Sequence, residues 1–214
     1  SAQELFWYDV LLEVEGEDVT EFEKTVDAYY SSVDFPEDVT MTFSSIGLKG
    51  QGFEETHILS FVSPSSQSLA NLRASLSDEK WENYLDLVRP LVDNVRVSAG
   101  NASKVFNAEE FYPIGQVWGF KVKSKYIPQF TVAFEKLMQT FDAPGFVGLA
   151  NVTHGISNGE NLLIYGTYPD LNSAFTFGPK NEAEASAFAE FFNVTGEISE
   201  FTQSWTRVKI QDYN

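Results

Sequence analysis

Hydrophobic positions recur at helical spacing in two stretches that lie 108 residues apart. In each stretch, apolar side chains occupy positions i, i+3, i+7 and i+10, which form the stripe that an amphipathic helix buries. Each stretch then reaches a proline, Pro36 or Pro144, which cannot continue a helix. The matched apolar positions are Val19, Phe22, Val26 and Tyr29 in the first stretch and Ile127, Phe130, Phe134 and Leu137 in the second.

Alternating apolar positions typical of strands repeat at the same offset, and after a loop the offset becomes 105, which places Pro64 on Pro169. The chain is therefore predicted to be a duplication, with residues 1–105 as the first repeat and 106–214 as the second. Each repeat reads strand, helix, strand, strand, helix, strand. The expected strands are 6–14, 38–46, 55–62, 94–99, 115–123, 145–153, 161–167 and 202–210, and the expected helices are 18–32, 66–90, 126–140 and 170–192.

This element order defines the ferredoxin-like unit, an antiparallel sheet with two helices on one face. In the segment 6–12, both alternating sets of residues include apolar side chains, and in 118–122 one set is wholly apolar, so we expect each sheet to need a cover on both faces. We therefore expect an α+β fold in which two ferredoxin-like βαββαβ repeats pack sheet to sheet as an intrachain α+β barrel.

The chain thus resembles the dimeric α+β barrel superfamily in its fused, tandem-repeat form. The resemblance covers residues 6–99 and 115–210 and rests on element order, because no signature motif is present. It implies the fold and leaves the activity open. Members of the superfamily include cofactor-free monooxygenases, haem-degrading enzymes, haem peroxidases, muconolactone-type isomerases and small stress-response proteins.

The amino-acid composition argues against several classes of function. The 214 residues include 31 acidic and 14 basic side chains, and a net charge of −17 argues against nucleic acid or an anionic membrane as a partner. No apolar run is long enough to insert into a membrane. The absence of cysteine excludes thiol catalysis, disulfides and iron–sulfur clusters, and two histidines cannot build a three-histidine metal site, so no metal is expected.

Two glycine-rich segments resemble catalytic motifs. Residues 155–159 spell G-x-S-x-G around Ser157, but the hydrolase motif requires a strand-to-helix turn, whereas this segment lies between two predicted strands. Its Asn-Gly pair favours a hairpin turn. Residues 47–52 precede a strand and so lack the helix N-terminus that binds phosphate. We interpret both segments as turns.

The two histidines are the candidate ligands for iron or haem. Glu55 and His57 share a strand face, and His154 ends a predicted strand in the other repeat. The repeat alignment places His57 on Leu162 and His154 on Ile46, so the histidines are not symmetry mates. We interpret them as strand-end residues. No cofactor is expected, haem is kept as an alternative, and the catalytic residues stay unknown.

Aromatic side chains are concentrated on the predicted strands, whereas Trp81 is the only tryptophan on a predicted helix. Such rings either fill a core or line a cavity for a flat ligand. Arg96 and Arg207 lie on the last strand of each repeat, as buried polar anchors or as charges that protect a sheet edge. The strand tryptophans are Trp7, Trp118 and Trp205.

These patterns lead to one prediction about a binding site and two about function. Any pocket is expected to touch Trp7 or Trp118 together with His57 or Tyr165. The first interpretation is an exported, periplasmic or secreted protein that binds a small hydrophobic or aromatic molecule, because the polar first residues lead directly into a strand. The alternative is a cofactor-independent monooxygenase or a haem-binding protein of the same superfamily. A monomer is expected, because one chain supplies both sheets.

Overall fold

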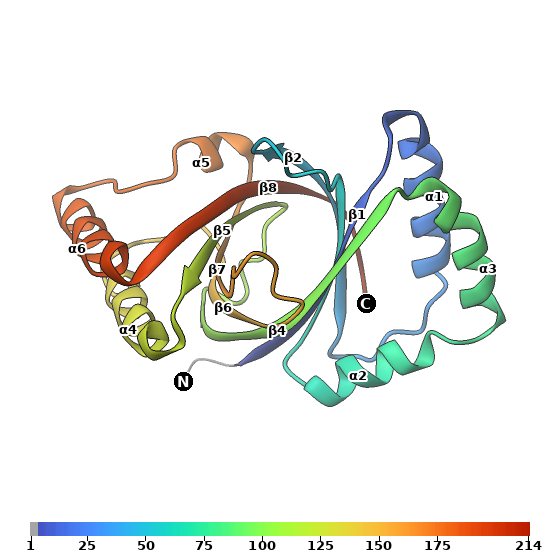
Figure 1. Cartoon of the computed structure of the whole chain (residues 1–214), viewed down its shortest axis with the longest axis horizontal. Helices are drawn as coiled ribbons and strands as arrows, with labels where there is room; N and C mark the ends of the chain where they lie inside the picture. Colours follow the sequence, from blue (N-terminus) through green and yellow to red (C-terminus); the bar gives the residue numbers. More distant parts are fainter. Residues whose placement is uncertain (1–3) are drawn as a thin grey trace.

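The computed structural model describes residues 4–214, which form one closed barrel of eight antiparallel strands with helices on its outside (Figure 1). Around the barrel the strand order is β1-β3-β2-β8-β5-β7-β6-β4. Each repeat therefore contributes four neighbouring strands in the ferredoxin-like order, which confirms the predicted fold class. The strands are β1 (Leu5–Glu13), β2 (Thr40–Lys49), β3 (His57–Ser63), β4 (Asn94–Phe106), β5 (Ile114–Val122), β6 (Val147–His154), β7 (Leu162–Tyr168) and β8 (Ser199–Tyr213).

The helices pack against the outer wall of the barrel, those of the first repeat on one side and those of the second on the other (Figure 1). The first helix of each repeat has 12 residues, and the two begin at Val19 and Ile127, at the offset that the apolar stripe predicted. The helices are α1 (Val19–Tyr30), α2 (Ser66–Ser75), α3 (Glu79–Val88), α4 (Ile127–Met138), α5 (Leu171–Phe175) and α6 (Glu182–Ile198), with short 3-10 turns at Gly16–Asp18, Arg89–Leu91 and Ser124–Tyr126.

The last strand of each repeat closes the barrel by pairing with the other repeat. β8 pairs with β2 from Met41↔Tyr213 to Lys49↔Trp205, and β4 pairs with β6 from Ala99↔His154 to Phe106↔Val147. Both strands are longer than expected, with 13 residues in β4 and 15 in β8. Residues 100–106, expected to be part of a connection, are strand because β6 supplies their hydrogen-bond partners.

Two expected helices are each broken into two. The segment 66–90 forms α2 and α3, which are separated by residues 76–78. The segment 170–192 forms α5 and α6, which are separated by residues 176–181. Gly178 has φ +140, a value that L side chains rarely adopt, and Pro179 follows it. The Asn181 side chain then accepts a hydrogen bond from the Glu184 N–H and begins the second helix. Residues 176–181 therefore form a loop between α5 and α6.

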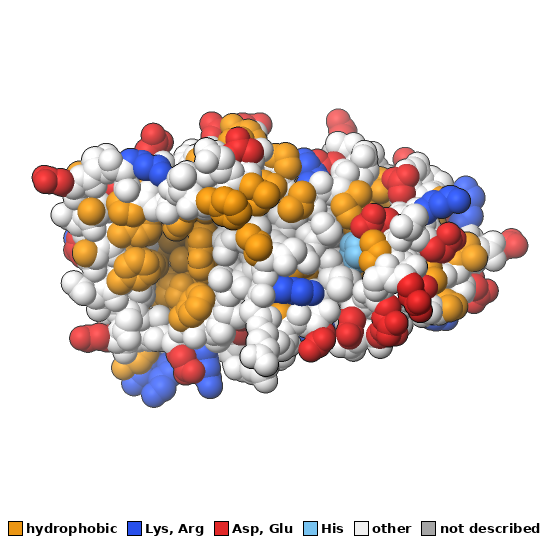
Figure 2. All heavy atoms as spheres, turned by 90° about the horizontal axis from the view of Figure 1, so that it is seen from above, with side chains coloured by type: hydrophobic (Ala, Val, Ile, Leu, Met, Phe, Trp, Pro, Cys, Tyr) orange, Lys and Arg blue, Asp and Glu red, His pale blue; other side chains and the backbone are white. Residues whose placement is uncertain are grey.

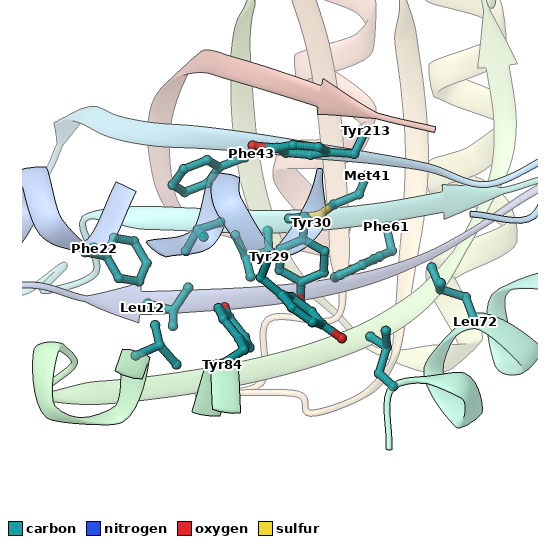
Figure 3. Packing of buried hydrophobic residues seen from close by; sticks show 14 of the residues in the cluster. Leu12, Phe22, Tyr29, Tyr30, Met41, Phe43, Phe61, Leu72, Tyr84 and Tyr213 are labelled. Carbon is teal, nitrogen blue, oxygen red and sulfur yellow. The ribbon is translucent and has the colours of Figure 1, made fainter. Parts of the chain in front are cut away.

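The interface between helices and sheet in the first repeat is filled by aromatic side chains (Figure 3). Tyr29 stacks on Tyr84 at 4.4 Å between ring centroids, and Tyr30 lies edge-on to Phe61 at 5.9 Å. Tyr213 from the end of β8 reaches the same cluster, and its hydroxyl donates to Asp27 at 2.7 Å. The interface between helices and sheet in this repeat is therefore packed as a core.

Candidate functional site

The second repeat holds a cavity of about 390 Å³ between its sheet and helices α4 and α6. Figure 2 shows it as a hollow lined by hydrophobic side chains on the left of the molecule, where α4 and α6 lie in Figure 1. Strands β5, β6 and β7 form the floor, and the two helices form the walls. The floor carries Trp118, Phe120, Val147, Ile164 and Tyr168, and the walls carry Phe134, Leu137, Met138, Phe188 and Phe191.

The repeat alignment shows which side chains differ at this interface. At the offset of 108 residues, Leu137 and Met138 occupy the positions of Tyr29 and Tyr30. Two large rings that fill the first repeat are thus replaced by smaller aliphatic side chains. Leu137 and Met138 both line the cavity, although the position of Val26 changes in the opposite direction, to Phe134.

Most polar groups in the cavity are already hydrogen-bonded within the protein. The Thr167 hydroxyl donates to the Glu110 carbonyl at 3.0 Å, and Thr195 donates to the Phe191 carbonyl at 2.8 Å. In contrast, no hydrogen bond found within residues 4–214 involves the hydroxyl of Tyr168 or the indole N–H of Trp118, and both residues line the cavity. These two groups are the donors available to a ligand.

Tyr168 lies at the end of β7, with 2% of its surface exposed. Burial raises the pKa of its phenol well above the ordinary value, so the hydroxyl stays protonated throughout the physiological range. A neutral phenol in apolar surroundings can donate a hydrogen bond to a ligand oxygen. It can also stabilise negative charge that develops on that oxygen.

The loop between α5 and α6 covers part of the cavity. Phe177 packs over Trp118 at 5.1 Å between ring centroids, and it also contacts Tyr168 at 5.9 Å and Phe188 at 6.0 Å. Phe192 and Phe201, which are 60% and 57% exposed, lie at the rim. The entrance is therefore apolar as well as the interior.

A buried carboxylate anchors this loop. Glu184, 3% exposed, accepts hydrogen bonds from the backbone N–H groups of Lys180 and Asp142, each at 2.8 Å. These bonds favour the ionised form and lower the pKa of Glu184. The loop is thus tied to the start of α6 and to the segment that follows α4.

Of the sequence-predicted site residues, Trp118 lines this cavity. Trp7 and Tyr165 lie together in a second, smaller cavity of about 80 Å³ inside the barrel. His57 lies outside both cavities. It packs beside the ring of Phe22 at 4.9 Å, and its Nε2 is 2.9 Å from an oxygen of Glu23 on α1. The structure therefore brings Trp7 and Tyr165 together and separates them from Trp118 and from His57.

The other candidates occupy structural positions. Residues 155–159 form the turn between β6 and β7, with φ +55 at Asn158 and +77 at Gly159, so the G-x-S-x-G segment is a hairpin turn as interpreted. His154 is exposed at the end of β6. Arg96 pairs with Glu55 at 3.0 Å, and Arg207 is buried inside the barrel. Within residues 4–214, no cluster of three His, Asp or Glu side chains could hold a metal ion.

Haem ligated by histidine does not fit the larger cavity. Its described lining contains neither histidine nor a charged side chain, and Met138 supplies the one thioether. His57 and His154 both lie outside this lining. No helix within residues 4–214 has the length and apolar character needed to cross a membrane.

Sequence reasoning did not select Tyr168, Phe177 or Met138 as site residues. Tyr168 and Phe177 carry no local motif, because any aromatic residue beside a strand reads equally well as core. The signal for Met138 was present in the repeat alignment, where Tyr30 is matched by a smaller side chain. A comparison of side-chain volumes between the two repeats would have located the cavity.

No protein-family model matches this sequence, and no curated protein matches it. Solved structures do match over the whole chain. A protein of Fusobacterium nucleatum provisionally described as a monooxygenase is 12% identical, with a TM-score of 0.68 over 100% of this chain and 95% of its own. A second protein with the same provisional description, from Lactobacillus acidophilus, is 12% identical, with a TM-score of 0.66 over 99% of this chain and 96% of its own.

A third match is an anthrone oxidase-like protein. It is 10% identical, with a TM-score of 0.64 over 98% of this chain and 92% of its own. At 10–12% identity, the similarity to these three proteins shows a shared fold and no more. The chain has the fold of the dimeric α+β barrel superfamily, with both sheets of the barrel in one polypeptide.

Proposed function

We propose that the protein binds a flat, largely apolar aromatic molecule in the cavity between the second-repeat sheet and helices α4 and α6. One observation carries this proposal: an aromatic-lined cavity of about 390 Å³ offers two unused hydrogen-bond donors, on Tyr168 and Trp118. Sites for small molecules have this character, with mostly apolar walls and a few polar groups that set orientation.

The expected ligand has two or three fused rings and one oxygen. Its rings would pack against Trp118 and Phe177 in offset or edge-on geometry. Burial of about 200 Å² of apolar ring surface contributes about 5 kcal/mol before the cost of association. The oxygen, as a carbonyl or hydroxyl, would accept the hydrogen bond from Tyr168.

A matched pair of ligands tests this orientation. Anthrone carries a carbonyl and anthracene carries none, so both should quench tryptophan fluorescence while only anthrone responds to Tyr168→Phe. We expect this variant to weaken anthrone binding about fivefold, the equivalent of a hydrogen bond of about 1 kcal/mol, and to leave anthracene binding unchanged. Trp118→Phe should remove most of the quenching, whereas the helical Trp81→Phe should not. Equal effects of Tyr168→Phe on both ligands would contradict the proposed pose.

A second candidate function is cofactor-independent oxygenation of such a ligand. Three whole-chain structural matches are described as monooxygenases or as anthrone oxidase-like, and this supports the candidate. For anthrone, the ring CH₂ loses two hydrogens and gains one oxygen atom from O₂. The second oxygen atom leaves with those hydrogens as water. The described lining of the cavity supplies no side-chain base, so the first proton of the CH₂ group would pass to a water molecule at the rim. Tyr168 would donate a hydrogen bond to the ligand oxygen that becomes negative as this proton leaves.

Oxygen uptake distinguishes catalysis from binding. An oxygenase should consume one O₂ per anthrone converted to anthraquinone, and Tyr168→Phe should lower kcat by 10-fold or more with a small change in KM. Uptake that equals the rate in buffer would leave the protein as a binding protein and reject the oxygenase candidate.

A further inference from the structure

The barrel interior contains a cation without a carboxylate partner. Arg207, on β8, is 5% exposed, and its Nε and Nη2 donate to the Tyr165 hydroxyl at 3.1 and 2.7 Å. Within residues 4–214, no Asp or Glu forms an ion pair with it. Arginine stays charged inside proteins, and a buried charge without a counter-charge costs several kcal/mol. Such a guanidinium attracts an anion.

Space for an anion lies beside Arg207. The barrel cavity of about 80 Å³ is lined by Arg207, Tyr165, Asp9 and Ser60 together with apolar walls that include Trp7 and Trp205. A water molecule needs about 10–15 Å³ measured in this way, so the cavity has room for several small atoms. Three or more fused rings would not fit.

Asp9 does not neutralise Arg207 by direct contact. Its carboxylate accepts a hydrogen bond from Ser60 at 2.6 Å, and it lies close enough to Arg207 for that charge to favour the ionised form of Asp9. Burial is the larger influence, and it raises the pKa of Asp9 despite the opposing effects of Arg207 and Ser60. Burial therefore shifts Asp9 toward its neutral form, in which it offsets the charge of Arg207 less, and no ion pair joins the two side chains within residues 4–214.

We propose that the barrel interior is a second binding site, which takes a small carboxylate or an anion of similar size and holds it on Arg207. This site is separate from the aromatic cavity, which is lined by a different face of the second-repeat sheet. A ligand of about three to five heavy atoms, such as formate or acetate, suits the volume. The remaining guanidinium donors of Arg207 would bind its oxygens.

A narrower cavity of about 50 Å³ adjoins the first and shares with it Asp9, Val117, Leu163 and Trp205. Its other end reaches the exposed Ser157 at the turn. This second cavity places the Arg207 site close to the surface at the turn between β6 and β7.

The charges around Asp9 make binding depend on pH. Arg207 and Tyr165 face it across the main cavity, and Arg96 and Glu160 line the adjoining one, where Arg96 is already paired with Glu55. An ionised Asp9 would offset Arg207 and repel an anion. Binding should therefore weaken as pH rises through the pKa of Asp9, by at most about tenfold per pH unit for one linked proton.

Calorimetric titration with formate and with acetate at constant ionic strength tests this site. The variants are Arg207→Gln, Asp9→Asn and, as a control, Arg73→Gln, which removes the same charge from outside the barrel, where Arg73 packs on Tyr8. We expect wild type to bind acetate more tightly at pH 5 than at pH 8. Arg207→Gln should weaken binding at least 10-fold at pH 5, and Arg73→Gln should change it less than twofold.

Asp9→Asn keeps the acceptor for Ser60 and removes the negative charge. It should therefore bind acetate at pH 8 about as tightly as wild type does at pH 5, a gain that misfolding cannot mimic. Three results would each overturn the proposal: no binding of either anion by wild type at any pH, unchanged affinity in Arg207→Gln, or equally tight binding of the much larger anthracene-9-carboxylate at this site.

Discussion

Met138 ends α4 at the position where Tyr30 ends α1, and Met138 lines the cavity of the second repeat whereas Tyr30 is packed in the core of the first. Tyr30, 2% exposed, fills its interface by packing against Phe61 and Tyr84. Met138 leaves the corresponding space open as a wall of the cavity. The interface between helices and sheet is thus filled in the first repeat and contains a cavity in the second.

Restoring the ring should close the cavity. We expect Met138→Tyr to weaken the binding of anthrone by 10-fold or more, because the phenol would occupy ligand volume, while the melting temperature stays equal or rises. Val132→Tyr is the control, since Val132 lies on the same helix and is 64% exposed. Fluorescence titration and thermal unfolding provide the two readouts. Unchanged affinity in Met138→Tyr would place the ligand elsewhere.

Phe177 should control how quickly a ligand leaves. Because its ring lies over Trp118, Phe177→Ala should raise the dissociation rate of anthrone several-fold. Phe175→Ala is the matched control, because Phe175 is 71% exposed on α5 and is not part of the cavity lining. Stopped-flow fluorescence measures both rates. Equal dissociation rates in the two variants would mean that the loop does not retain the ligand.

Glu184 should make part of the stability depend on pH. Its pKa is lowered in the folded protein, so its contribution is fully present above about 4.5, the ordinary value, and is lost as pH falls through the folded pKa. Glu184→Gln should therefore lower the melting temperature at pH 7, and its difference from wild type should shrink below pH 4. A difference that stays constant from pH 7 to pH 3 would show that ionisation of Glu184 is not involved.

Two glycines should respond to alanine in opposite ways. A side-chain carbon added at Gly196, in α6, meets open space, so Gly196→Ala should stabilise the protein by about 0.5–1 kcal/mol through helix propensity. At Gly100, in β4, the added carbon would collide with the backbone carbonyl of Asn151. Gly100→Ala should therefore strongly destabilise the barrel. Denaturant unfolding measures the free energy of unfolding of both variants. A Gly100→Ala variant as stable as Gly196→Ala would contradict the importance of this close approach.

The chain is expected to be a monomer in solution. Its closed barrel already pairs β2 with β8 and β4 with β6, so the sheets need no second copy, and a net charge of −17 opposes casual association. Light scattering at low micromolar concentration and moderate salt should give a mass near 24.0 kDa. A stable dimer under these conditions would contradict this expectation.

The sequence was sufficient for the architecture because periodicity and prolines are local signals. The apolar stripes that begin at Val19 and Ile127 become α1 and α4 at the predicted offset. The ends of β4 and β8 could not be predicted in the same way. Residues such as Lys104 join a strand only because the other repeat supplies Leu149 as a partner.

The site was harder to predict because the strands are buried on both faces. In β3, six of the seven residues from His57 to Ser63 are buried, so alternation does not tell which side chains face the barrel and which face the helices. His57 faces α1, and this orientation could not be predicted from the sequence because both faces of β3 are buried. Export to the periplasm or medium stays a prediction from the sequence.

The central claim is that the second-repeat cavity holds a flat aromatic ligand oriented by Tyr168, and a crystal structure of the protein grown with anthraquinone tests it most directly. We predict density for the ligand between β5–β7 and helices α4 and α6, with one carbonyl oxygen within hydrogen-bond distance of the Tyr168 hydroxyl. Clear density for the ligand at any other place, with the cavity closed by its own side chains, would contradict the claim.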